Sequence, residues 1–249
     1  TAIFTFYIEA VAESLNRRLG FSPNRKVAQR VIAAVTDAIL NAGRGHISLQ
    51  QAIALAEEIS PSQNLEQKDL VVQLENEGLI ATELVETARD GEQTLVRFTF
   101  ERFSDHMIAA RLLERHLNVA DPAASFAKGQ PLAAYVSGPE TWARAGVIEA
   151  LAVQLPEKAG VEILDVAPCD DSDWTLRQSF EESLLWREQR CFTKRTLQLV
   201  EALADETIDA YRTLIAIATE PTNQFNASYL FDRLAPLEVA ERDATWSAW

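Results

Sequence analysis

The chain has 249 residues, of which 47% are hydrophobic and 24% are charged. These fractions are ordinary for a globular protein and exclude a disordered or fibrous chain. Lys and Arg number 23 against 37 Asp and Glu, so the formal net charge is −14. A protein that binds nucleic acid regardless of sequence needs a basic surface, and this acidity counts against that class.

Four segments at the start of the chain carry apolar side chains at helical spacing. Ser48 with Gln51, and Asn64 with Gln67, have the spacing of a capping box and predict the starts of the third and fourth helices. Pro61 ends the third. The four predicted helices are 3–19, 25–42, 48–60 and 64–78.

After residue 78, the spacing of the apolar side chains changes to the two-residue period of β-strands. Residues 79–87 are rich in β-branched side chains, and residues 94–100 alternate, with Val96, Phe98 and Phe100 on one face. Asp90-Gly91 between them predicts a β-hairpin. Three helices followed by a hairpin are the order of a winged helix. The buried core of that domain is predicted to include the rings of Phe98, Phe100 and Phe103.

The rest of the chain is predicted to be helical. A long helix covers 101–118, and residues 121–139 are expected to be a linker with one short helix. Short helices at close intervals indicate HEAT-like repeats, with an irregular helical bundle as the alternative. These predicted helices are 141–155, 157–166, 174–187, 193–204, 207–219, 226–235 and 237–249.

Charge supports a division of the chain near residue 120. Residues 1–120 hold 12 basic and 16 acidic side chains, whereas residues 121–249 hold 11 and 21. The predicted fold is therefore mainly α. It has a helical lead-in over 1–20, a winged helix with its long trailing helix over 21–120, and a helical-repeat region of sensor type over 121–249.

No catalytic, cofactor or metal-binding motif is recognisable in the sequence. The chain contains no Gly-Lys pair, so a phosphate-binding P-loop is not encoded. Zinc sites place two His four residues apart or Cys in close pairs, and neither spacing occurs. We expect this chain to be no enzyme and to hold no cofactor or metal; an enzyme with an unrecognised carboxylate or metal site is the rival. The residues considered for metal are His46, His106, His116, Cys169 and Cys191.

One basic cluster stands out, because no acidic residue lies between Glu13 and Asp37. It is predicted to be a solvated face or a contact to an acidic neighbouring domain, with a nucleic-acid or phosphate contact as the alternative. The predicted helix over 64–78, which would enter the DNA groove in a winged-helix regulator, has net charge −3 and argues against DNA. The cluster consists of Arg17, Arg18, Arg25, Lys26 and Arg30.

The sequence indicates a cytoplasmic protein. Two Cys do not make a disulfide framework, which favours a reducing compartment. No apolar run approaches the roughly 20 residues of a membrane helix, and Arg17 and Arg18 follow the first apolar run, whereas a signal peptide has its charges before it. Since the chain begins at Thr1 and its only Met is Met107, we expect it to be a piece of a longer protein.

Several stretches resemble one family in their order along the chain. They are VRFTFERFSDHMIAARLL (96–113), EALAVQLPE (149–157), SLLWR (183–187), NASYL (226–230) and ERDATW (241–246). This order resembles the region after the NTPase core in bacterial STAND-type NTPases, which are NACHT-like, and in particular the Avs antiviral-defence group. The likeness covers residues from about 90 to 249, and every motif in it is a packing pattern.

The resemblance implies a central, non-catalytic region of a multidomain ATPase. In such proteins a winged helix follows the NTPase core and a helical-repeat sensor recognises a phage protein, so the partners would be other domains of the parent protein and that phage protein. Related NACHT proteins carry a His after the wing that touches the nucleotide, in an F-x-H pattern. Phe98-Thr99-Phe100-Glu101 departs from it. The alternative function is a winged-helix DNA-binding regulator with a helical dimerisation or ligand domain.

Overall fold

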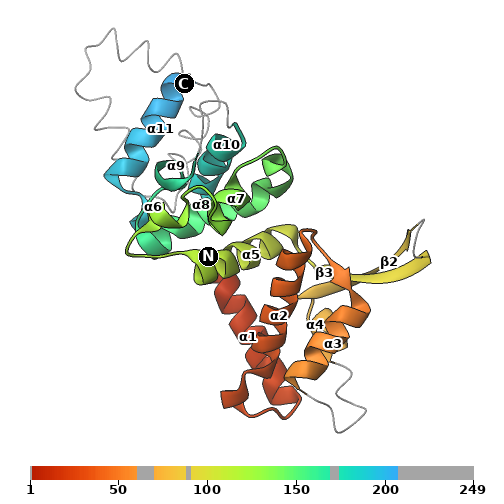
Figure 1. The fold of residues 1–249 in the computed structure, drawn as a ribbon. Coiled ribbons are helices and arrows are strands. Elements are labelled where there is room, and N and C mark those ends of the chain that lie inside the picture. The colour runs from red at the N-terminus through yellow and green to blue at the C-terminus, as the bar shows by residue number, and fades with distance from the viewer. Residues whose placement is uncertain (1, 61–69, 88–90, 169–173, 207–249) are drawn as a thin grey trace, which may run out of the picture. The chain divides into compact units, whose positions relative to one another are not determined.

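The computed structural model describes residues 2–60, 70–87, 91–168 and 174–206 of the chain. The chain divides into two compact units, residues 1–115 and 116–249, and the division lies close to the change in charge near residue 120. The protein is mainly α-helical, with a three-stranded sheet in the first unit (Figure 1).

The first unit begins with helices and closes with a hairpin and a long helix. Each helix and strand predicted up to residue 100 has a counterpart among the described residues, with α4 (Leu70–Asn76) in the described part of the predicted helix over 64–78 and the second strand ending at Phe98. The Ser48 cap is confirmed, because its Oγ accepts a hydrogen bond of 3.1 Å from the Gln51 N–H. The predicted cap at Asn64 and the turn residue Asp90 lie outside the described residues. In chain order the elements are α1 (Ala2–Arg18), a 3-10 helix (Pro23–Arg25), α2 (Val27–Ala42), β1 (Ile47–Ser48), α3 (Leu49–Ile59), α4 (Leu70–Asn76), β2 (Ile80–Thr87), β3 (Gly91–Phe98) and α5 (Glu101–His116).

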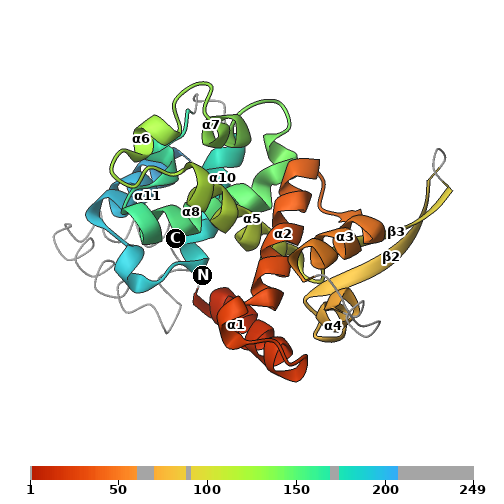
Figure 2. The ribbon, with the colours of Figure 1, turned by 60° about the horizontal axis from the view of Figure 1, so that its bottom comes forward.

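The sheet is antiparallel, with β3 between β1 and β2. β2 and β3 pair over their whole length, from Ile80 opposite Phe98 to Thr87 opposite Gly91, and the hairpin extends beyond the helices of its unit (Figure 2). Glu75 at the end of α4 joins that helix to β2, since its carboxylate accepts hydrogen bonds from the Thr82 N–H, at 3.1 Å, and from the Thr82 hydroxyl.

The core of the first unit is apolar. The predicted stripe on α2 is confirmed: Val27, Val31 and Val35 are buried at four-residue spacing. Phe98 and Phe103 are also buried, with their rings edge to face and their centroids 5.5 Å apart. Such a pair contributes about 0.5–1.5 kcal/mol beyond the burial of its area.

The prediction that Phe100 belongs to this core is wrong. Its side chain is 64% exposed, because β3 ends at Phe98 and the alternation of faces ends with it. Phe100 instead precedes α5, and its carbonyl accepts the Ser104 N–H of the first helical turn at 3.0 Å. The rings of Phe98 and Phe103 therefore fill the junction of strand and helix without Phe100.

The second unit is built from helices in the described residues. The interpretation of 121–139 as a linker is wrong, because this segment forms two short helices with Phe126 and Leu132 in the core. Arg144 ties the end of the second of them to the unit by donating to the carbonyls of Ala134 and Tyr135 at 3.1 and 3.0 Å. The elements are α6 (Pro122–Ser125), α7 (Pro131–Val136), a 3-10 helix (Thr141–Arg144), α8 (Ala145–Ala159), α9 (Ile163–Val166), α10 (Trp174–Ser183), two 3-10 turns (Leu184–Trp186 and Gln189–Cys191) and α11 (Lys194–Glu206).

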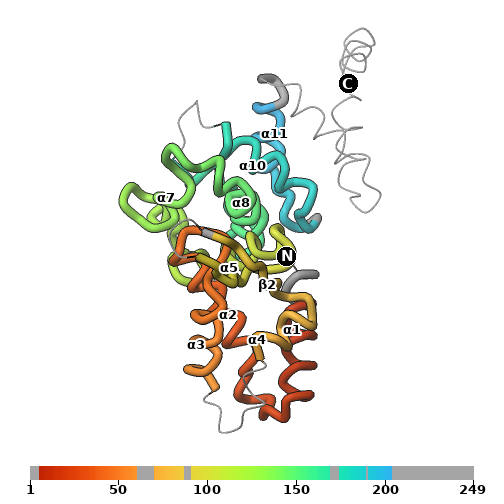
Figure 3. The backbone as a smooth tube through the Cα atoms, turned by 90° about the vertical axis from the view of Figure 1, so that its right-hand side faces the viewer, coloured from red at the N-terminus to blue at the C-terminus, as the bar shows by residue number. Residues whose placement is uncertain are grey.

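Helix α8 is the centre of the second unit. Every residue from Val147 to Pro156 is buried, and α10 packs along it (Figure 3). The predicted end of a helix at residue 155 is wrong, because α8 continues through Pro156 to Ala159. A proline removes one backbone hydrogen bond, and Pro156 lies near the C-terminal end of the helix. Gly160, at φ 67°, ends α8, so the predicted helix over 157–166 is reduced to α9. The predicted helices beyond residue 206 lie outside the described residues.

Candidate functional site

The five predicted cations follow one another around the junction of α1 and α2. Arg17 and Arg18 end α1, where a positive charge is favourable next to the free carbonyls of the helix end. Arg25 ends the 3-10 helix, Lys26 precedes α2, and Arg30 lies one turn into α2. All five side chains are exposed.

Arg18 is the exception among them, because it has one partner on α4 and one in the turn that follows α4. Its Nη2 lies 2.8 Å from Gln73 Oε1 and 2.7 Å from Glu77 Oε1. Tyr7 adds a second link between α1 and the end of α4, since its hydroxyl donates to the Glu77 carbonyl at 3.2 Å. Arg18 therefore holds α1 against α4 and is not part of an open electrostatic surface.

The other four cations have open charged groups. Among the described residues, no hydrogen bond or ion pair engages the side chains of Arg17, Arg25, Lys26 and Arg30. We call these four residues the basic surface. Two of them, Arg17 and Lys26, line one hollow of about 430 Å³, so the structure brings the end of α1 and the start of α2 together around a concave site.

The wall of this hollow combines charge, amides and apolar surface. A volume of this size lies in the usual range of ligand pockets, roughly 300–1,000 Å³. Glu13 contributes its only carboxylate. The remaining side chains of the wall are the amides of Asn16 and Gln29 and the apolar groups of Phe21 and Pro23.

Asn16 organises the floor of the hollow and was not identified from the sequence. It is only 4% exposed, its Oδ1 accepts the Ala28 N–H at 3.0 Å, and its Nδ2 donates to Gln29 Oε1 at 2.7 Å. It thereby caps α2 from the neighbouring helix, where Lys26 offers no side-chain cap. The sequence feature that could have identified Asn16 is its position as a polar residue on the buried stripe of α1, beside Ala12 and Leu15.

Lys26 has the backbone conformation that glycine normally adopts. Its φ and ψ are both 45°, and it is the only non-glycine residue with positive φ in the described part of the chain. This left-handed conformation costs an ordinary residue about 1–2 kcal/mol. The surrounding turn therefore fixes the position from which the Lys26 ammonium extends, at the edge of the hollow.

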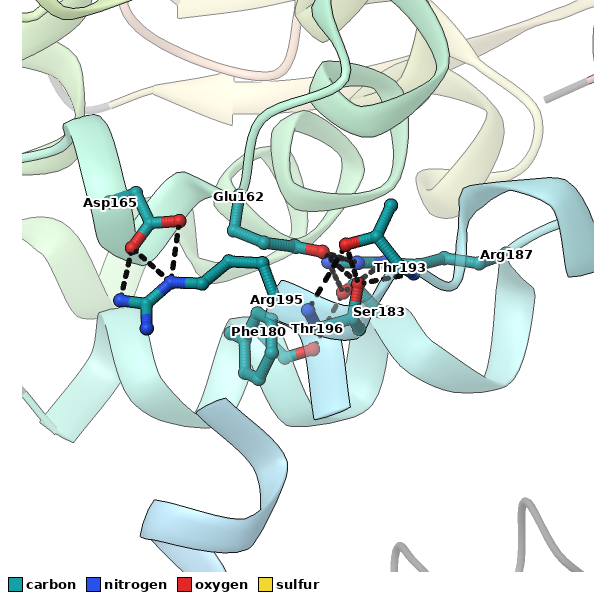
Figure 4. Close-up of polar contacts among 8 residues, drawn as sticks. All are labelled: Glu162, Asp165, Phe180, Ser183, Arg187, Thr193, Arg195 and Thr196. Atoms are coloured by element: carbon teal, nitrogen blue, oxygen red, sulfur yellow. Dashed lines mark hydrogen bonds and ion pairs between the residues drawn. The ribbon is translucent and has the colours of Figure 1, made fainter. Parts of the chain in front are cut away.

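A second polar cluster lies inside the second unit (Figure 4). The side chains of Glu162 and Arg187 are 3% and 0% exposed, and Arg187 Nη1 lies 2.9 and 2.7 Å from the two carboxylate oxygens. Ser183 Oγ accepts from Arg187 Nε and Nη2, and the guanidinium stands 5.2 Å from the centre of the Phe180 ring. Burial lowers the pKa of Arg187, and the Glu162 carboxylate opposes that shift.

The Glu162–Arg187 pair also anchors α11. Thr196 donates its hydroxyl to Glu162, and its N–H donates to Thr193 Oγ1 at 3.2 Å, which caps the helix. Arg195 on the same helix makes an outer contact with Asp165, with Nη2–Oδ1 at 2.6 Å. Every group in the buried cluster is engaged by another, so its arrangement indicates a structural role.

The residues considered for metal binding are separate in the structure. His46 follows α2, His116 ends α5, and His106 is buried within α5, where burial foremost lowers its pKa to about 4. Cys191 is a buried free thiol whose pKa is raised by burial, and Cys169 lies outside the described residues. In the described ranges no group of three or more His, Cys, Asp or Glu side chains is arranged to hold a metal ion.

Comparison of the chain with family models, with curated proteins and with solved structures finds no match. Over the residues that the structure describes, no helix has the length and apolar character needed to cross a membrane.

Proposed function

We propose that this chain is a non-catalytic, regulatory and protein-recognition region of a bacterial STAND-type NTPase of the Avs antiviral-defence group. The observation that carries the proposal is the order of elements in the first unit. Helix α2, β1, α3, α4 and the β2–β3 hairpin follow one another, with β3 central in the sheet. That is the order of a winged helix, and the family resemblance places a winged helix directly before a helical sensor region.

The helical second unit supports the sensor part of the proposal. In a HEAT-like array, helices stack in pairs, and an inner helix is covered by its neighbours. Helix α8 is buried along Val147–Pro156 and packs with α10, as an inner helix of such an array would. Under this proposal the unit recognises a protein partner, such as a phage protein, in the bacterial cytoplasm.

The reading frame that surrounds this chain tests the proposal most directly. A P-loop of the form GxxxxGK[ST] encoded upstream supports it, and a frame that encodes no such loop contradicts it. Calorimetry gives a second test on the isolated chain. Because the sequence has no Gly-Lys pair, we expect neither tight ATP binding nor ATP turnover above a heat-inactivated control.

The second candidate, a DNA-binding regulator, is favoured by the same element order together with the basic surface. Against it, the two described strands of the hairpin carry Glu83, Glu86 and Glu92, and Arg97 is the one cation within these strands. Glu75 and Glu77, which end the α4 region, face Thr82 and Arg18 instead of offering positive charge to DNA. We expect no detectable binding to duplex DNA at physiological salt, and specific binding that survives high salt would favour the regulator.

A further inference from the structure

The unpaired cations of the first unit are concentrated in one place. Arg18, Arg97, Arg111 and Arg115 each have an acidic partner. Within the described part of the first unit, the basic side chains without a hydrogen-bonded or ionic partner are Arg44 and the four residues of the basic surface. Of these five, four lie within the short stretch that surrounds the hollow. Neighbouring cations repel one another, so this concentration stabilises no internal contact.

The floor of the hollow adds a hydrogen-bond donor to these charges. Since Asn16 Oδ1 accepts from the Ala28 N–H, its Nδ2 is the donor toward Gln29. Gln29 therefore accepts through Oε1, and its Nε2 is left as a donor that no described group engages. With Arg17 and Lys26 on the same wall, three side chains present donors to the hollow.

We propose that the basic surface and its hollow form a docking site for an acidic polypeptide segment of a partner protein. The cations pair with its carboxylates, and Arg17 offers the planar fork that matches a carboxylate. Phe21 and Pro23 provide the apolar part of the wall for one apolar side chain between the acidic residues. This docking site rests on the proposed role in protein recognition, and it specifies an acidic segment as the part of the partner that binds.

A short acidic segment fits this surface better than duplex DNA does. The chain carries a net charge of −14, and the hairpin of the same unit is acidic. A duplex is long and uniformly charged, so it meets repulsion beyond the basic surface over the screening distance of about 10 Å at 0.1 M salt. A short peptide contacts the four cations and extends no further.

Substitution of Glu13 is the most decisive test of the proposal. It is the one carboxylate in the wall, it is exposed, and no described group pairs with it. Like charge opposes an acidic ligand, so E13Q is expected to strengthen binding, whereas a purely structural role of this surface predicts no such gain. Lys26→Gly removes a cation and suits the left-handed backbone at this position, so its effect on binding does not arise from misfolding.

The experiment measures fluorescence anisotropy of a labelled oligoglutamate peptide with one central leucine, titrated with the full chain at low salt. The wild type is expected to bind, R17A and K26G to weaken binding about threefold to tenfold each, and added salt to weaken it further. E13Q should tighten binding. Arg44→Ala is the matched control, since it removes the same charge from an exposed and unpaired site of the same unit and should leave the affinity unchanged.

Three outcomes would overturn the docking site: no binding by the wild type, an equal loss in R44A, or tighter binding of a duplex DNA through Arg17 and Lys26 than of the peptide. The last outcome would show that this surface binds nucleic acid and not an acidic peptide. Peptide binding is independent of whether a P-loop is encoded upstream, so a failure of this site and a failure of the proposed NTPase membership are distinguishable.

Discussion

The two units each contain a distinctive group of charged residues, and these two groups differ in burial and in pairing. The first unit has an apolar core and keeps Arg17, Arg25, Lys26 and Arg30 exposed and unpaired. The second unit encloses the guanidinium of Arg187 and the carboxylate of Glu162 in its core and engages both with hydroxyl groups. A buried charge is costly without its partner, whereas an exposed one costs little. The difference teaches that the buried Glu162–Arg187 pair supports the fold of the second unit, whereas the basic surface of the first unit is available to a partner.

The largest effect is expected from removing Arg187. Arg187→Met leaves the Glu162 carboxylate buried without its counter-charge, and such a loss costs about 3–5 kcal/mol. All five Trp follow the division between the units, so Trp fluorescence in a urea titration reports the unfolding of the second unit. Arg195→Met is the matched control, because its ion pair with Asp165 is largely exposed and should contribute about 0–1 kcal/mol. Equal effects of the two variants would refute the contrast between buried and exposed charges.

A comparable effect is expected from the apolar core of the first unit. Phe98→Ala removes a ring that is 2% exposed and should cost about 3–5 kcal/mol. The loss should be visible by circular dichroism, whereas the Trp transition should change little because no Trp belongs to this unit. Phe100→Ala should leave the stability nearly unchanged, since that ring is 64% exposed. A larger loss in F100A than in F98A would show that the strand does not end at Phe98.

An intermediate effect is expected where charges of the first unit are paired and half-buried. Asp37 on α2 receives two arginines of α5: Arg111 Nε and Nη2 lie 2.8 and 2.7 Å from its oxygens, and Arg115 Nη2 lies 2.5 Å away. This contact raises the pKa of Arg111. Asp37→Asn should cost about 1–3 kcal/mol in urea titrations followed by circular dichroism. Glu114→Gln, which alters an exposed contact of the same arginine, is the control and should have a much smaller effect.

The smallest effect on stability is expected at the basic surface. Arg17→Ala and Arg30→Ala remove exposed side chains without partners, so the free energy of unfolding should change by about 0.5 kcal/mol or less. Thermal unfolding of the full chain measures this. A loss comparable to that of D37N would show that these cations stabilise the fold, and would remove the distinction on which the docking site depends.

The sequence by itself determined the local elements of this protein. Helical spacing identified α2 and its buried stripe, Ser48 marked the start of α3, and the alternation of Val96 and Phe98 identified a strand. Each of these features depends on residues only a few positions apart, so the local period and the local cap are sufficient to predict it.

Only the tertiary structure decided which residues distant in sequence meet and where the local patterns end. Phe100 continues the alternation of β3 in the sequence but lies beyond the strand, and Pro156 is accepted near the end of a buried helix. Asn16 caps α2 across a turn, and Glu162 meets Arg187 from a different element. A buried polar group needs a partner, and the identity of that partner is set by how the elements pack. No local periodicity contains that information.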